Sequence, residues 1–260
     1  MLALIVLFGG AIVGLALGSL RPGAITGGEF GVSDWRAIIH DPDFRDALRF
    51  TAFVAFTATA TSTILAVVGA ALLQHRPRWL RGAFASAVPM PHLVAASLAV
   101  TWLAPGGLAE RLVGALPFPV IGDSHGLGII AVYIFKEAPF LTLLTLAAWD
   151  QHTRDLEEVA ATLGASRWAR LRDTVLPRLA PPLVAGALIV AAFTLGATEV
   201  PLLVGPTKPD TIATYALTVV HTDGPAARAR ATAALVIVTA ITLTLGALAA
   251  IVQRRRRATR

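Results

Sequence analysis

Six long apolar runs constrain this chain more than any other feature of its sequence. Roughly 20 mostly apolar residues are needed for a helix to cross about 30 Å of hydrocarbon. Apolar residues make up 55% of the 260 positions, charged residues only 15%, and the mean hydropathy is +0.69. The predicted spans cover residues 1–20, 47–73, 83–104, 126–149, 180–204 and 231–252. The sequence therefore predicts an all-α integral membrane protein with a single domain over residues 1–260.

The first run has a second interpretation, as a cleaved signal peptide. It lacks a basic region at its start, and it is longer than a usual signal core, which favours a membrane span. The polar segment that follows, residues 21–46, looks amphipathic and is expected to lie along the outer surface.

The arginines predict the orientation of the spans. One side of the membrane receives the larger share of the basic residues: Arg76, Arg78, Arg81, Arg154, Arg167, Arg170, Arg172, Arg178, Arg254, Arg255, Arg256, Arg257 and Arg260. The other side receives Arg21, Arg36, Arg45, Arg49, Arg111, Lys208, Arg228 and Arg230. Because cytoplasmic loops carry the excess of Lys and Arg, both termini are predicted to be cytoplasmic. The run 254–257 is interpreted as a membrane anchor rather than a nucleic-acid patch.

The sequence offers no support for an intrinsic enzymatic activity. There is no cysteine, so thiolate metal sites and thiol nucleophiles are excluded. Neither Lys136 nor Lys208 follows a glycine, so the chain has no phosphate-binding loop of the ATPase type. The six histidines are scattered without metal-ligand spacing and are interpreted as loop or interface residues. We expect neither a metal nor a cofactor.

The loop between the fourth and fifth spans, residues 150–179, is the most informative segment and is called the coupling loop below. Asp155 is expected to cap a first helix, with Glu158 completing a capping box. Gly164 is expected to end that helix in the left-handed conformation. Ser166 is then expected to cap a second helix, which must stop before Pro177. The small residues Ala160 and Ala161 would leave a helical face of low relief, against which another protein could pack.

This loop resembles the signature of the permease subunits of binding-protein-dependent ABC importers. The family pattern is Glu-Ala-Ala, three residues, Gly, nine residues, then Ile-x-Leu-Pro. Glu158, Ala160, Gly164, Leu176 and Pro177 stand at the matching positions with the correct spacing. Two positions depart mildly from the pattern, with Val159 for the first alanine and Thr174 for the isoleucine.

The resemblance extends over most of the chain and includes Pro89-x-Pro91 and Ala138-Pro139-Phe140. It implies a type I permease fold in a bacterial or archaeal plasma membrane, with residues 158–164 forming a coupling helix on a separate ATPase subunit. It also implies a second permease copy or paralogue, and a binding protein that delivers the substrate from outside. The stretch 195–205 resembles loosely the permeases for iron(III), thiamine, polyamines or phosphonates, which leaves the substrate open.

Lys136, Glu137 and Glu199 fall inside predicted spans, where ionisable side chains are costly and usually face a partner or a watery cavity. Two interpretations stay open: these residues line the substrate path, or they form a structural ion pair. Opposed leaning of side chains on the antiparallel fourth and fifth spans predicts a contact between Lys136 and Glu199. One rival to the whole interpretation is a membrane-bound enzyme, which the missing catalytic residues disfavour, and the other is a secondary transporter or channel. Proteins of that class carry their charged sites in two related halves with broken helices.

Overall fold

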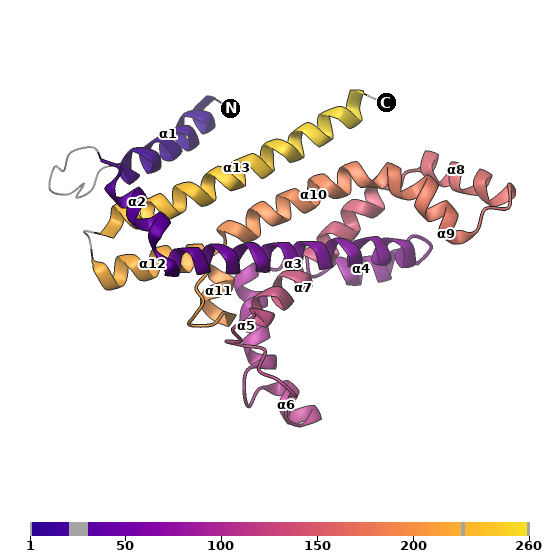
Figure 1. Cartoon of the computed structure of the whole chain (residues 1–260). Helices are drawn as coiled ribbons and strands as arrows, with labels where there is room; N and C mark the ends of the chain where they lie inside the picture. The colour runs from indigo at the N-terminus through magenta and orange to yellow at the C-terminus, as the bar shows by residue number, and fades with distance from the viewer. Residues whose placement is uncertain (1, 21–30, 225–226, 259–260) are drawn as a thin grey trace.

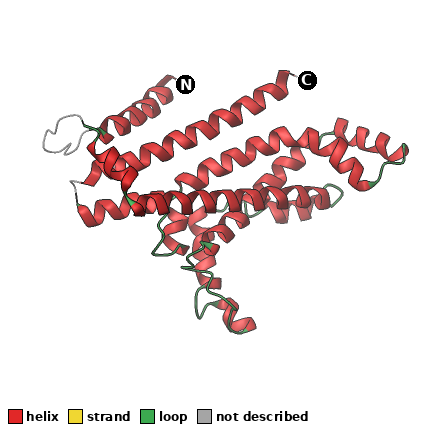
Figure 2. Cartoon of the chain, viewed as in Figure 1, coloured by secondary structure: helices red, strands yellow, loops and turns green. Residues whose placement is uncertain are grey.

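The computed structural model describes residues 2–20, 31–224 and 227–258, and these form helices joined by loops (Figures 1 and 2). The helices are α1 (Leu2–Ser19), α2 (Ser33–His40), α3 (Pro42–Leu73), α4 (Arg78–Ala85), α5 (His92–Leu103), α6 (Leu108–Val113), α7 (Leu127–Ala148), α8 (Gln151–Thr162), α9 (Arg167–Ala169), a π-helix (Arg170–Val175), α10 (Leu176–Gly196), α11 (Glu199–Val204), α12 (Ile212–Asp223) and α13 (Arg228–Ala258). No strand occurs in these ranges, which confirms the all-α prediction.

Five helical segments of the described chain are long and apolar enough to cross a membrane: Pro42–Leu73, His92–Val113, Leu127–Ala148, Arg167–Gly196 and Arg228–Arg254. They correspond to the second to sixth predicted spans. The first predicted span is helical as α1, an apolar helix of 18 residues.

Helix α7 is the central helix of the bundle. It packs against α3 along much of its length and also contacts α5 and α10 (Figure 1). More of its surface is buried than that of any other candidate span. Ile129, Val132 and Tyr133 pack with Phe50 and Val54 of α3 in one apolar cluster. The polar residues of α7 are therefore held in a well-packed part of the molecule.

The third predicted span, residues 83–104, is interrupted, and its prediction as one helix is wrong. Helix α4 ends at Ala85, turns occupy residues 86–90, and α5 begins at His92. Pro89 and Pro91 explain the break. A proline has no N–H to donate, and its ring collides with the carbonyl of the fourth residue before it, which is Ala85 for Pro89.

The fifth predicted span, residues 180–204, is interrupted in the same way. Helix α10 ends at Gly196, Ala197 is extended with φ −73° and ψ 140°, and α11 begins at Glu199. Pro201 stands four residues after Ala197, so a continuous helix would bring its ring against that carbonyl. Both interruptions lie beside α7, since α11 contacts α5 and α7.

The described part of the predicted amphipathic segment packs into the bundle through one face. Residues 21–30 lie outside the described residues. Helix α2 contacts α3 and α13, and Ile38 is fully buried in a cluster with Phe44 and Tyr215. The polar face of α2 carries exposed residues, as the amphipathic pattern predicts.

Candidate functional site

The first helix of the coupling loop is capped by Asp150, so the prediction of Asp155 as its cap is wrong. The Asp150 carboxylate accepts hydrogen bonds from the backbone N–H of Thr153 at 3.0 Å and from its hydroxyl at 2.8 Å. Helix α8 thus begins five residues earlier than predicted, directly after the buried Trp149. Asp155 lies within α8 and accepts a hydrogen bond from the Gln151 amide at 2.8 Å. Glu158 is exposed near the middle of the helix.

Gly164 ends this helical segment in the left-handed conformation, as predicted, with φ +83°. The N–H of Gly164 donates to the Ala161 carbonyl, and that of Ala165 donates to the Ala160 carbonyl, both at 3.0 Å. These bonds satisfy carbonyls that the end of the helix leaves free. Ser166 caps α9, also as predicted, because its hydroxyl oxygen accepts a hydrogen bond from the Ala169 N–H at 3.2 Å.

The second helix of the loop does not stop before Pro177, contrary to prediction. It continues through the π-helix into α10, and Pro177 lies in the first turn of α10. A proline is tolerated there because the first N–H groups of an α-helix have no partner within the helix. Leu176 is partly buried and Pro177 exposed, while Val175 and Leu179 are buried against Trp149. The loop is thereby anchored to the fifth span and to the end of α7.

The tip of the coupling loop exposes large apolar side chains. Val159 is 54% exposed, Leu163 83% and Trp168 64%. Figure 1 shows α8 and α9 at one end of the bundle, away from α5 and α6. Leu163 and Trp168 were not predicted as site residues, and Val159 was named only as a departure from the family pattern. Their signal is present, since Val159 and Leu163 are four residues apart on an otherwise polar helix. A surface of this kind suits a protein partner better than water.

Lys136 is buried in α7, and it does not pair with Glu199. Its ammonium donates to the carbonyls of Ala87 at 2.7 Å and Val88 at 2.9 Å, and also to that of Met90. The Glu199 carboxylate accepts from the N–H of Thr198 at 3.2 Å. Among the ion pairs of the described residues, none joins Lys136 to Glu199. The prediction of that contact is wrong, because the interrupted third span supplies carbonyls that satisfy the ammonium instead.

Glu137 pairs with His92, the first residue of α5, at 2.9 Å between Oε1 and Nε2. The imidazole also lies against the Phe193 ring, with ring centroids 4.5 Å apart. His92, Lys136, Glu137 and Phe193 border a cavity of about 260 Å³. The sequence predicted His92 to be an ordinary loop or interface residue. Its position directly after Pro91 in an apolar run was the signal that could have identified it.

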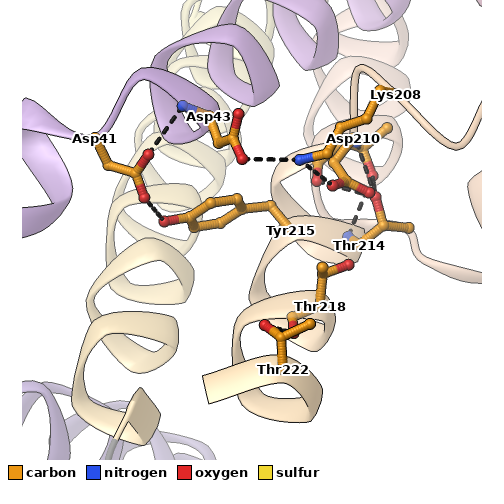
Figure 3. A network of polar contacts seen from close by, with 9 residues as sticks. Asp41, Asp43, Lys208, Asp210, Thr214, Tyr215, Thr218 and Thr222 are labelled. Carbon is orange, nitrogen blue, oxygen red and sulfur yellow. Dashed lines mark hydrogen bonds and ion pairs between the residues drawn. The ribbon is translucent and has the colours of Figure 1, made fainter.

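A polar network closes the opposite end of the bundle from the coupling loop (Figure 3). Tyr215 donates to Asp41 at 2.5 Å, and Lys208 donates to Asp43 at 2.9 Å and lies 3.4 Å from Asp210. The bond to Asp43 raises the pKa of Lys208. Burial, and then the bond to Asp41, raise the pKa of Tyr215. These contacts join the start of α3 to the start of α12, and sequence analysis did not predict them.

Known proteins are similar to this chain in sequence and in fold. Residues 69–258 match the family described as binding-protein-dependent transport system inner membrane component. The inner membrane ABC transporter permease protein YnjC of Escherichia coli is 31% identical over 219 residues, covering 78% of this chain and 40% of YnjC. The trehalose transport system permease protein SugA of Mycobacterium tuberculosis is 32% identical over 168 residues, covering 61% of this chain and 53% of SugA. The chain thus spans about half or less of the length of these relatives.

Among solved structures, the fold resembles a chain of a bacterial alginate ABC transporter in complex with an alginate pentasaccharide-bound periplasmic protein. The TM-score is 0.78 at 19% identity, with 98% of this chain and 91% of that chain covered. A second alginate importer structure gives a TM-score of 0.75 at 21% identity, with 98% and 92% covered. The family match over most of the chain, together with this fold, shows that the chain belongs to the family of binding-protein-dependent transport system inner membrane components.

Proposed function

We propose that the chain is the permease subunit of an ATP-driven importer in a bacterial or archaeal plasma membrane, and that it forms half of a translocation pathway. A second permease copy or a paralogue supplies the other half, and a binding protein outside the cell delivers the substrate. ATP is hydrolysed by a separate ATPase subunit. The family membership and the alginate importers of similar fold support this proposal.

The exposed apolar tip of the coupling loop carries the proposal of an ATPase partner. Val159, Leu163 and Trp168 project beside the small residues Ala160 and Ala161, and Gly164 gives the tip its turn. Glu158 lies on the same exposed helix, and Leu176 and Pro177 join the tip to the fifth span. A groove on the ATPase would cover the three large side chains and remove their apolar surface from water.

For the charged residues inside the bundle, the geometry favours different roles. Lys136 is fully occupied by backbone carbonyls, so it is a poor candidate for direct contact with cargo. Glu137 borders the cavity with His92, and Glu199 begins α11 with a partly exposed side chain. We propose that Glu137 and Glu199 face the translocation path.

The absence of cysteine makes the ATPase contact directly testable. A single cysteine at Leu163 should cross-link to an ATPase subunit that carries a reactive cysteine series along its surface groove. A matched cysteine at Leu112, which is 71% exposed on α6, serves as the control and should not cross-link. Equal cross-linking from the two positions, or none from Leu163 in an active complex, would contradict the proposed contact.

A further inference from the structure

The interruption of the third span leaves backbone carbonyls that helical bonds do not satisfy. Helix α5 takes Pro91 as its first acceptor, since the Ala95 N–H donates to the Pro91 carbonyl. The Val88 and Met90 carbonyls precede that helix, and both accept from the Lys136 ammonium, together with Ala87. A lysine ammonium has three N–H donors, and all three are used here. In a poor dielectric this arrangement stabilises both the buried charge and the break.

The next residue of α7 holds the other side of the same interruption. Glu137 binds His92, where α5 begins, at 2.9 Å. Successive residues of an α-helix point about 100° apart, because 3.6 residues complete a turn. Lys136 and Glu137 therefore reach the interrupted span at two places, the turns of residues 86–90 and the start of α5. Two kinds of contact therefore fix the break to α7: hydrogen bonds from an ammonium to backbone carbonyls, and a carboxylate–imidazole pair.

Helix α7 continues from these contacts directly to the coupling loop. Ala148, its last residue, stands twelve positions after Lys136, a rise of about 18 Å. Trp149 follows and is 1% exposed, packed against Val175 and Leu179, and Asp150 then caps α8. Only two residues, Trp149 and Asp150, separate the end of α7 from the start of α8, and the packing of Trp149 limits the displacement that they can absorb. Movement of α8 would therefore carry α7 with it.

We propose that Lys136 and the Glu137–His92 pair are positioning contacts that make the interrupted third span follow α7, and through α7 the coupling loop. Lys136 acts on the turns at 86–90, and Glu137 acts on α5. This inference rests on the proposed function, in which the ATPase acts on α8. It assigns to Lys136 a role in coupling rather than in binding the transported solute.

The test measures hydrogen–deuterium exchange in the permease–ATPase complex, in lipid nanodiscs, with and without ATP plus orthovanadate. Exchange in residues 150–165 reports the response of the coupling loop, and exchange in residues 86–97 reports the response of the interrupted span. In the unaltered complex we expect nucleotide to change both segments. In Lys136→Met, exchange at residues 86–92 should rise about tenfold or more in the resting complex, since hydrogen bonds to a charged donor are lost. The nucleotide response of residues 86–97 should disappear, while that of residues 150–165 persists.

Three further variants separate a positioning role from a general loss of stability. Lys136→Arg keeps charge and donors and should retain most of the response, and Phe135→Leu, at a half-exposed neighbouring position, should behave as the unaltered chain. His92→Leu removes the donor to Glu137, breaks only the second contact and should weaken the response of α5; it provides the test if Lys136→Met fails to assemble. An unchanged response of residues 86–97 in Lys136→Met, or in His92→Leu in that case, overturns the inference alone. If nucleotide does not change the exchange of residues 150–165 in the unaltered complex, the proposed function is overturned as well.

Discussion

At the scale of single residues, the network in Figure 3 predicts a loss of stability at alkaline pH. The pKa values of Lys208 and Tyr215 are both raised in the folded chain. A group whose folded pKa is raised contributes stability that is complete below its unfolded pKa, about 10.4 for Lys and 10 for Tyr. That stability is lost as the pH rises through the folded values. The unfolding midpoint of the purified chain should therefore fall more steeply above about pH 10 than below it.

Variants at the same network assign this slope to named groups. Lys208→Met and Tyr215→Phe should each flatten the fall between about pH 10 and 11. The Lys208 contribution should stay below about 1 kcal/mol, because Lys208 and Asp43 are 55% and 63% exposed and solvent screens the pair. Arg172→Met is the control, since it removes an exposed ion pair with Asp173 in the coupling loop, at the other end of the bundle. Identical slopes in all three variants would show that the network does not carry the effect.

At the scale of elements, the two candidate caps of α8 can be separated by experiment. Asp150→Ala should cost about 1 kcal/mol, because the Thr153 N–H and hydroxyl lose their acceptor. Asp155→Ala removes an exposed side chain from the helix interior and should change stability by less than about 0.5 kcal/mol. Amide exchange at residues 151–156 is the measurement. Faster exchange in Asp155→Ala than in Asp150→Ala would restore the cap predicted from sequence.

The elements also show what a sequence can predict here. The apolar runs predicted where the spans lie, because a helix in lipid needs a continuous apolar length. The left-handed conformation of Gly164 and the cap at Ser166 were also predicted correctly. The cap was misplaced because Asp150 and Asp155 are both plausible caps, and only the buried Trp149 fixes where α7 ends. The interruptions at Pro89 and Pro201 were missed because continuous hydrophobicity was taken as a continuous helix.

The intramembrane contacts depended on those interruptions. A lone lysine in an apolar span predicts a partner, but the sequence does not say whether that partner is a carboxylate or a set of backbone carbonyls. Once α4 and α5 separate at residues 86–91, carbonyls become available close to Lys136, and no ion pair is needed. His92 and Glu137 are far apart in sequence, so their pairing requires the packing of α5 on α7.

At the scale of the whole molecule, basic residues gather at one end of the bundle. Helices α10 and α13 pack together and run in opposite directions, so α13 ends toward the same side of the bundle as the start of α10 and the coupling loop (Figure 1). Helix α3 also ends on this side, followed by Arg76, Arg78 and Arg81. The opposite end carries the mixed charges of the Figure 3 network. The arginines that the sequence assigns to one side of the membrane thus lie at one end of the bundle. This grouping favours the coupling-loop end as the cytoplasmic one.

Single cysteines in the cysteine-free chain test that orientation in intact cells. A membrane-impermeant maleimide should label Asp46→Cys, because Asp46 is 63% exposed beside Arg49 at the end opposite the coupling loop. The same reagent should label Trp79→Cys and Leu163→Cys, which are 72% and 83% exposed, only after the membrane is opened by detergent. Arginines cluster near Trp79 and in the coupling loop, and moving these charges across the bilayer is costly. Labelling of Trp79→Cys and Leu163→Cys in sealed cells, with Asp46→Cys protected, would place the coupling loop outside the cell. It would then be out of reach of any cytoplasmic ATPase, and the proposed function would fail with the orientation.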